Sequence, residues 1–248
     1  MSIETIDPER LARLMDPANH LRRGKGLGVN GAFDACAMQA VHWLAGGDCS
    51  SDAPECVAPM IARYVIRLND AVTFTDWRDE LKPYLPRLLN TVNPALEMRR
   101  AYLCVDWAVR WCAPLAFDAA ADALAGEGFI VDFAEQAASL REHAATMRAL
   151  PEVTDAASAQ SARAAAAYAA AAVRAATYAA YAADAADAAA RAAAATRGYA
   201  DDAARDAARA AAIAAYSAAD AAYAAETKRA IWDGALDLLD RLIRVEVA

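Results

Sequence analysis

The residues that could do chemistry are polar side chains set in apolar, helix-forming sequence. His42, Asp70 and Asp106 can exchange protons with a substrate if an acid and a base meet in one cleft. Asp106 precedes Arg110 by four residues, so on a helix the two charges share one face and neutralise each other as an ion pair. No nucleophile and general base are set together along the chain. Structural ion pairs and helix caps are therefore the favoured interpretation, and an enzyme that uses His42, Asp70 and Asp106 is an alternative.

A second set of residues could line a pocket for a small ligand. Tryptophan rings stack on cationic or flat ligands, and arginine holds anionic groups such as phosphate. The alternative function is therefore the binding or sequestration of a nucleotide-like signal between helices. The candidate pocket residues are Trp43, Asp70, Arg100, Trp107 and Trp111. No phosphate-binding loop, HExxH motif, nucleophile elbow or dinucleotide fingerprint is present, so we expect no cofactor.

The five cysteines predict neither disulfides nor a metal site. An odd number of cysteines in a sizeable chain is typical of reduced thiols. None forms a CxxC pair, and His42 with the cysteines around it lacks the ligand spacing of a zinc site, so we expect no metal. The N-terminal segment is charged, and no stretch of leucine, isoleucine and valine reaches membrane-spanning length. These features favour a cytoplasmic protein without a membrane partner.

The overall charge argues against nucleic acid as a partner. The 248 residues carry 33 acidic and 25 basic side chains, which gives a formal net charge of −8. Arginine and aspartate are interleaved along the chain rather than gathered into a basic block. Nucleic acid would be repelled on average, so we expect no nucleic-acid binding.

Helices must position these residues, because no segment alternates apolar and polar residues with the β-branched enrichment of a strand. The predicted class is all-α, and residues 1–150 should form an N-terminal multi-helix bundle. An aspartate or asparagine before a proline predicts a helix start, and a proline inside a segment predicts a kink or a split. The predicted segments are 8–15, 32–45, a helix capped by Ser51 or Asp52 that holds Pro54 in its first turn and ends near residue 72, a segment capped by Thr75 and split at Pro83 and Pro86, 94–113, 115–125 and 130–150.

Residues 156–225 consist mostly of alanine, the strongest helix former, and no proline interrupts them. Thr154 or Asp155 should cap a first helix that reaches residue 196, and Gly198 should form the turn. A second helix should run from about residue 201 into the leucine-rich end, where Gly234 should loosen it. The predicted second domain, residues 151–248, is therefore a long alanine-rich antiparallel helical hairpin, because methyl-sized side chains let two helices approach closely.

The polar stripes of these alanine-rich helices allow two interpretations. They can be solvated surface, joined by ion pairs at helical spacing. They can also form a recognition surface for a protein partner, because tyrosine and arginine carry much of the binding energy at protein interfaces. The candidate surface residues are Tyr168, Tyr178, Tyr181, Arg205, Arg209, Tyr216 and Tyr223. Alanine faces left bare would also favour a homo-oligomer through these helices.

Two parts of the chain resemble known protein groups. The stretch LAGGDCSSDAPECVAPMIARYVIRLNDAV, with LKPYLPRLLNT and RRAYLCVDWAVR after it, resembles bacterial and phage proteins that share a pattern of LAGE, SDxPxCVxPVI, LNDA and PRLxGT. The match covers residues 35–114, implies no activity, and departs from the pattern at Asn90, where a glycine is usual. The repeat of residues 156–225 is similar to the alanine-rich helices of immunity proteins with an Imm-5-like domain. That similarity implies a protein that binds and neutralises a toxin or a defence factor.

These features together favour a non-enzymatic binding or accessory protein. Its expected partner is a protein effector in bacterial or phage conflict, and the polar stripes of the hairpin are its expected contact surface. The pocket for a small ligand and the enzyme remain the two alternatives.

Overall fold

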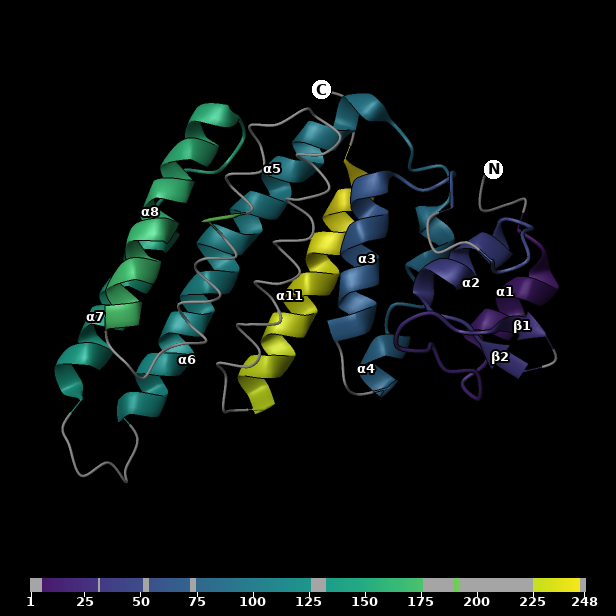
Figure 1. The fold of residues 1–248 in the computed structure, drawn as a ribbon, viewed down its shortest axis with the longest axis horizontal. Helices are drawn as coiled ribbons and strands as arrows, with labels where there is room; N and C mark the ends of the chain where they lie inside the picture. Colours follow the sequence, from purple (N-terminus) through teal and green to yellow (C-terminus); the bar gives the residue numbers. More distant parts are fainter. Residues whose placement is uncertain are drawn as a thin grey trace. The chain divides into compact units, whose positions relative to one another are not determined.

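The chain folds as an all-α protein in two compact units. The computed structural model describes residues 6–30, 32–50, 54–71, 75–125, 133–175, 190–191 and 225–245 (Figure 1). Unit 1 comprises residues 1–97 and 239–248, and unit 2 comprises residues 98–238. The domain boundary expected at residue 151 falls inside unit 2 and stays a prediction. No helix among the described residues combines the length and the apolar character that a membrane span requires.

The elements follow one another along the chain with short connections. In unit 1 they are α1 (Pro8–Met15), β1 (Gly28–Asn30), β2 (Ala32–Asp34), α2 (Ala37–Leu44), α3 (Pro59–Ala71), α4 (Thr75–Asp79) and the 3₁₀ turns η2 (Leu85–Leu88) and η3 (Pro94–Leu96). In unit 2 they are α5 (Glu97–Trp107), the π-helical turn η4 (Ala108–Cys112), α6 (Ala113–Ala125), α7 (Ala134–Arg148) and α8 (Ala156–Ala175). The first residue of α5, Glu97, belongs to unit 1. The last helix, α11 (Ala225–Arg244), contributes residues to both units.

Local capping places several of these elements as the sequence predicts. The carboxylate of Asp7 accepts a hydrogen bond from the Glu9 amide at 2.9 Å, so α1 begins at Pro8. Asn93 caps η3 by accepting from the Ala95 amide at 3.2 Å. The prolines at positions 83 and 86 end regular helix after α4, and only turns and η2 follow.

The expectation that the first 150 residues contain no strand is wrong. β1 and β2 form an antiparallel pair in which Val29 faces Phe33. The helix expected from residue 32 therefore begins at Ala37. Cys36 is its N-cap in an extended conformation, and the side chain of Gln39 accepts from the Cys36 amide at 3.2 Å.

The start of α3 also differs from the prediction, which placed it before Pro54. The residues proposed as its cap, Ser51 and Asp52, lie outside the described residues. Pro54 belongs to a turn, and α3 begins at Pro59, because distant side chains satisfy its first amides. Thr91 Oγ1 accepts from the Ala58 amide at 3.0 Å, and the buried carboxylate of Glu97 accepts from the Met60 amide at 3.2 Å.

The break expected between residues 113 and 115 does not occur. Helix continues from α5 through η4 into α6, and the widened turn of η4 precedes Pro114. The Ala113 amide donates to the Ala108 carbonyl, five residues back. A proline has no amide to donate, and its ring collides with the carbonyl four residues back in a regular α-helix. The π-turn relieves this conflict without ending the helix.

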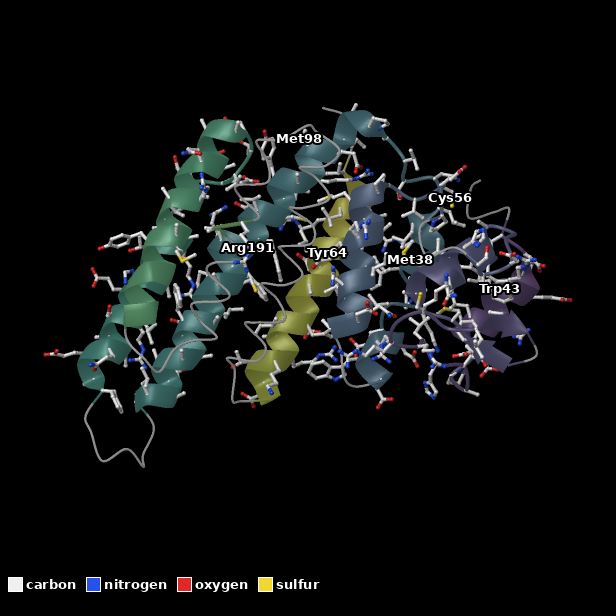
Figure 2. The ribbon with its side chains drawn as sticks, viewed as in Figure 1. Met38, Trp43, Cys56, Tyr64, Met98 and Arg191 are labelled. Atoms are coloured by element: carbon white, nitrogen blue, oxygen red, sulfur yellow. The ribbon has the colours of Figure 1, made fainter. Side chains whose placement is uncertain are left out.

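Each unit has its own apolar core. In unit 1, Met38 of α2 and Tyr64 of α3 are fully buried (Figure 2). In unit 2, α6 lies against α7 and buries Phe117 and Leu140. The ion pair of Arg141 with Asp122, at 2.9 Å, joins the exposed sides of these two helices.

Candidate functional site

Most of the described part of the alanine-rich region is α8, and the start of this helix is fixed by reciprocal capping. Asp155 accepts from the Ser158 amide at 2.8 Å, and Ser158 Oγ accepts from the Asp155 amide at 3.1 Å. The hydrogen bond from the Ser158 amide is the main cause that lowers the pKa of Asp155, so the cap stays ionised. The prediction that Thr154 or Asp155 caps this helix is confirmed, with Asp155 as the cap.

One face of α8 is a buried stripe of alanine. Ala159, Ala162, Ala166 and Ala169 recur at the spacing of a helix face and are buried. α8 lies against α7 and η4 in unit 2 (Figure 1). Methyl side chains allow this approach without bulky groups between the backbones. α8 therefore presents a different face to the solvent.

Tyr168 is the large aromatic side chain on the solvent side of α8. It is 72% exposed, and its ring meets the ring of His143 edge to face, with centroids 5.8 Å apart. The ring of His143 in turn lies 6.4 Å from that of Phe117, which is fully buried. Aromatic rings from α6, α7 and α8 thus contact one another in series from the core of unit 2 to its surface. The contact with His143 holds the exposed ring of Tyr168 in place.

The other predicted surface residues cannot be placed. They lie outside the described residues and stay predictions: Tyr178, Tyr181, Arg205, Arg209, Tyr216 and Tyr223. The turn lies outside the described residues as well, and of the predicted second helix only the C-terminal part, α11, is described.

Two of the predicted pocket residues lie in unit 1 and have partners within the chain. Trp43 of α2 meets Phe33 edge to face at 6.3 Å, and the guanidinium of Arg10 lies 5.4 Å from its ring centre (Figure 2). Asp70, near the end of α3, accepts from the Gly24 amide at 2.9 Å. Both side chains thus make their contacts within unit 1.

The other three pocket residues lie in unit 2. Trp107 and Trp111 stack with centroids 5.4 Å apart, and Arg100 is 2% exposed. Trp111 lies over Gly234 of α11, where an added Cβ would come within 2.2 Å of the indole ring. Gly234 does not loosen α11, which is continuous, but leaves room for Trp111. The five pocket residues are thus divided between the two units, and the pocket stays a prediction.

The residues of the enzyme alternative also serve structural contacts. Asp106 accepts from Arg110 at 2.8 Å, as predicted, and from the Val153 amide at 3.0 Å. His42 Nδ1 lies 3.8 Å from the carboxylate of the exposed Asp48, which is not one of the two predicted catalytic aspartates. His42 and Asp70 belong to unit 1, whereas Asp106 belongs to unit 2.

The cysteines are free thiols. All five lie in the described part of the chain. Burial raises the pKa of Cys112, whose side chain is fully enclosed, so its thiol stays protonated at neutral pH. Across the described ranges, no three histidine, cysteine or carboxylate side chains gather closely enough to hold a metal ion.

The sequence reasoning did not find His143, because no local spacing connects it to Tyr168. The sequence predicts a glycine-bearing connector at residues 19–30, but its alternating glycines were not linked to a function.

Comparison with protein-family models, with curated proteins and with solved structures finds no match to this chain.

Proposed function

We propose that the chain is a non-enzymatic cytoplasmic accessory protein that binds an effector protein in bacterial or phage conflict. Tyr168, with the edge of α8 around it, forms part of the contact surface. The observation that carries this proposal is the exposure of a large aromatic ring that contacts a side chain of the neighbouring helix.

The physical basis is the low entropic cost of presenting this ring. Tyrosine has few rotatable bonds, and the contact with His143 restricts its ring further before any partner arrives. Exposed tyrosines that a partner protein buries on binding are among the residues that contribute most of the binding energy at protein interfaces. The alternative chemistries are less favoured because Asp70, Asp106 and Trp43 already have partners within the chain.

The test is affinity purification of the full chain from its native cells, followed by calorimetry with the retained protein. We expect a stoichiometric protein partner, and Tyr168→Ala should weaken its binding about thirtyfold, which corresponds to about 2 kcal/mol. Tyr168→Phe keeps the ring on His143 and should retain most of the affinity.

Val92→Ala provides the matched control, because it truncates an exposed apolar side chain in unit 1. This variant should bind as the wild type does. The proposal fails if no protein partner is retained, or if Tyr168→Ala binds as tightly as Val92→Ala. Native mass spectrometry of the same preparation reports a homo-oligomer by its mass, and a retained small molecule would favour the ligand-binding alternative.

A further inference from the structure

The connector between α1 and β1 presents alternate side chains to the solvent. Arg23, Lys25 and Leu27 are exposed, and Leu27 is 89% exposed. The residues between them, Gly24 and Gly26, turn their backbone toward the protein. Two cations and one apolar side chain therefore point outward from one short loop. The term docking loop is used below for residues 23–27.

The glycines of this loop are required by close approach and by backbone conformation. A Cβ on Gly26 would lie 2.0 Å from the carbonyl oxygen of Asp34. Gly24 has a φ of +68°, a conformation that residues with a side chain rarely adopt. Arg23, Lys25 and Leu27 are the positions at which the loop can carry side chains.

Buried Gln39 holds the inner side of the docking loop. Its amide oxygen accepts from the Gly26 amide at 2.7 Å and from the Cys36 amide. Its amide nitrogen donates to the carbonyls of Gly26 and Cys49, each at 3.0 Å. All the hydrogen-bonding positions of this side chain, which is 1% exposed, are thus used to fix backbone.

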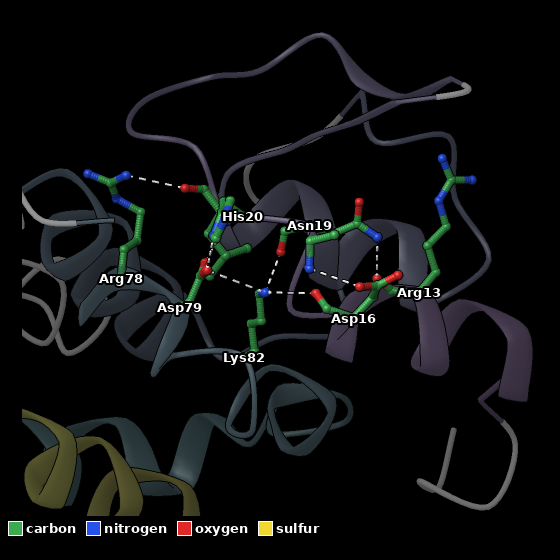
Figure 3. Close-up of polar contacts among 9 residues, drawn as sticks. Arg13, Asp16, Asn19, His20, Arg78, Asp79 and Lys82 are labelled. Atoms are coloured by element: carbon green, nitrogen blue, oxygen red, sulfur yellow. Dashed lines mark hydrogen bonds and ion pairs between the residues drawn. The ribbon is translucent and has the colours of Figure 1, made fainter. Parts of the chain in front are cut away.

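Charged and amide side chains of α3 and α4 fix the beginning of the connector. Asn69 donates to the Arg22 carbonyl at 2.9 Å, and Arg78 donates to the Leu21 carbonyl at 3.2 Å. Asp79 accepts from the Leu21 amide at 2.7 Å. Lys82, just after α4, donates to the carbonyls of Asp16 and Asn19 and forms an ion pair with Asp79 (Figure 3).

Asp34 closes the loop at its base. One of its carboxylate oxygens accepts from the Arg22 guanidinium at 2.7 Å, and the other accepts from the Leu27 amide at 3.0 Å. The Arg22 hydrogen bond is the main cause that lowers the pKa of Asp34, so the carboxylate stays ionised at neutral pH. Arg22 is thereby neutralised, whereas no ion pair of Arg23 or Lys25 occurs in the described structure.

We propose that residues 23–27 dock an acidic segment of a protein partner, with Arg23 and Lys25 on its carboxylates and Leu27 in its apolar contact. The charge of the loop contrasts with the net charge of −8 of the whole chain, which makes it the local attraction for an acidic partner. The fixed backbone lowers the entropic cost of forming this contact.

A protein is favoured over the two other anionic surfaces. The acidic chain repels a nucleic acid on average, and two cations release few counterions from a phosphate backbone. On a membrane, a single leucine and two cations give only marginal anchoring, because stable membrane binding takes a larger apolar anchor or a longer basic patch. A protein interface uses the same three side chains as a compact central contact.

Because a protein partner is itself part of the proposed function, the docking loop rests on that proposal. The two contact sites nevertheless belong to different units, since Tyr168 lies in unit 2. They can therefore be tested separately.

The test is fluorescence anisotropy of the full chain with a labelled short peptide in which glutamate and leucine alternate. We expect saturable binding that weakens with added salt. Arg23→Glu/Lys25→Glu should weaken it about tenfold or more, and Leu27→Ala about fivefold. Thermal midpoints should stay unchanged, because these side chains are exposed.

The matched control is Arg63→Glu/Arg67→Glu, which makes the same change in net charge on exposed positions of α3. This variant and Tyr168→Ala should bind the peptide as the wild type does. The docking loop is overturned if the peptide does not bind, or if the α3 control weakens binding equally. Loop-dependent binding of an oligonucleotide, or of phosphatidylserine vesicles, at the same affinity would overturn the choice of a protein partner.

Discussion

The buried side chain of Gln39 fixes the backbone conformation of the exposed docking loop. Its amide joins the docking loop to the start of α2 and to the segment that contains Cys49. A buried backbone group that loses its partner costs about 1–3 kcal/mol, because it also has no water to bind. The conformation of the loop therefore depends on a residue that no partner would touch.

We expect Gln39→Leu to lower the free energy of unfolding by about 2–4 kcal/mol in urea denaturation. Gln136→Leu makes the same substitution at an exposed position of α7 and should change stability by about 0.5 kcal/mol or less. Equal effects of the two substitutions would contradict the role given to Gln39.

Asn90 illustrates what residue identity alone can and cannot predict. Its φ is +62°, in the left-handed region that favours glycine. Asparagine tolerates that region better than most residues, so the backbone there keeps the form that a glycine would allow. The asparagine is visible in the sequence, but its left-handed conformation is not.

At the scale of elements, local signals were predictable and distant ones were not. The caps Asp7 and Asp155 act on neighbouring amides and were found from the sequence. The caps of α3 come from Thr91 and Glu97, more than thirty residues away, so its start was misplaced. The break predicted after residue 113 was wrong, because the widened turn of η4 accommodates Pro114 within a continuous helix.

At the scale of elements, replacing Gly234 in α11 by alanine should destabilise the protein, although this change normally stabilises a helix. Within a helix, Gly→Ala normally stabilises by up to about 1 kcal/mol. Here the added methyl would meet Trp111, so Gly234→Ala should destabilise by about 1–3 kcal/mol in thermal unfolding. In a Trp111→Leu background the same substitution should become neutral or stabilising. A stabilising effect in the wild-type chain would show that α11 does not lie against Trp111.

At the scale of the whole molecule, the ion pair of Asp240 with Arg87 joins residues that are 153 positions apart. Asp240 accepts from Arg87 at 2.6 Å and from Arg244 at 2.9 Å, and its side chain is 19% exposed. The general class of the fold followed from composition and helical spacing. The ion pair of Arg87 with Asp240 could not be predicted in this way, because two residues so far apart produce no periodic pattern in the sequence.

Asp240→Asn should therefore lower the free energy of unfolding by about 1–2 kcal/mol, because two arginines would lose their shared carboxylate. Asp233→Asn is the control on the same helix, since its pair with Arg229 is exposed on both sides. That control should change stability by a few tenths of a kcal/mol at most. A comparable loss in both variants in guanidinium denaturation would contradict the closure by Asp240.

Unit 1 unites the beginning of the chain with its last ten residues. During synthesis, its first 97 residues emerge from the ribosome before the rest of the chain has been made. At about 5–20 residues per second, the delay before the closing segment emerges is on the order of 10 s. Until then unit 1 lacks the buried side chains of Leu239 and Leu242, so part of its apolar core stays unfilled.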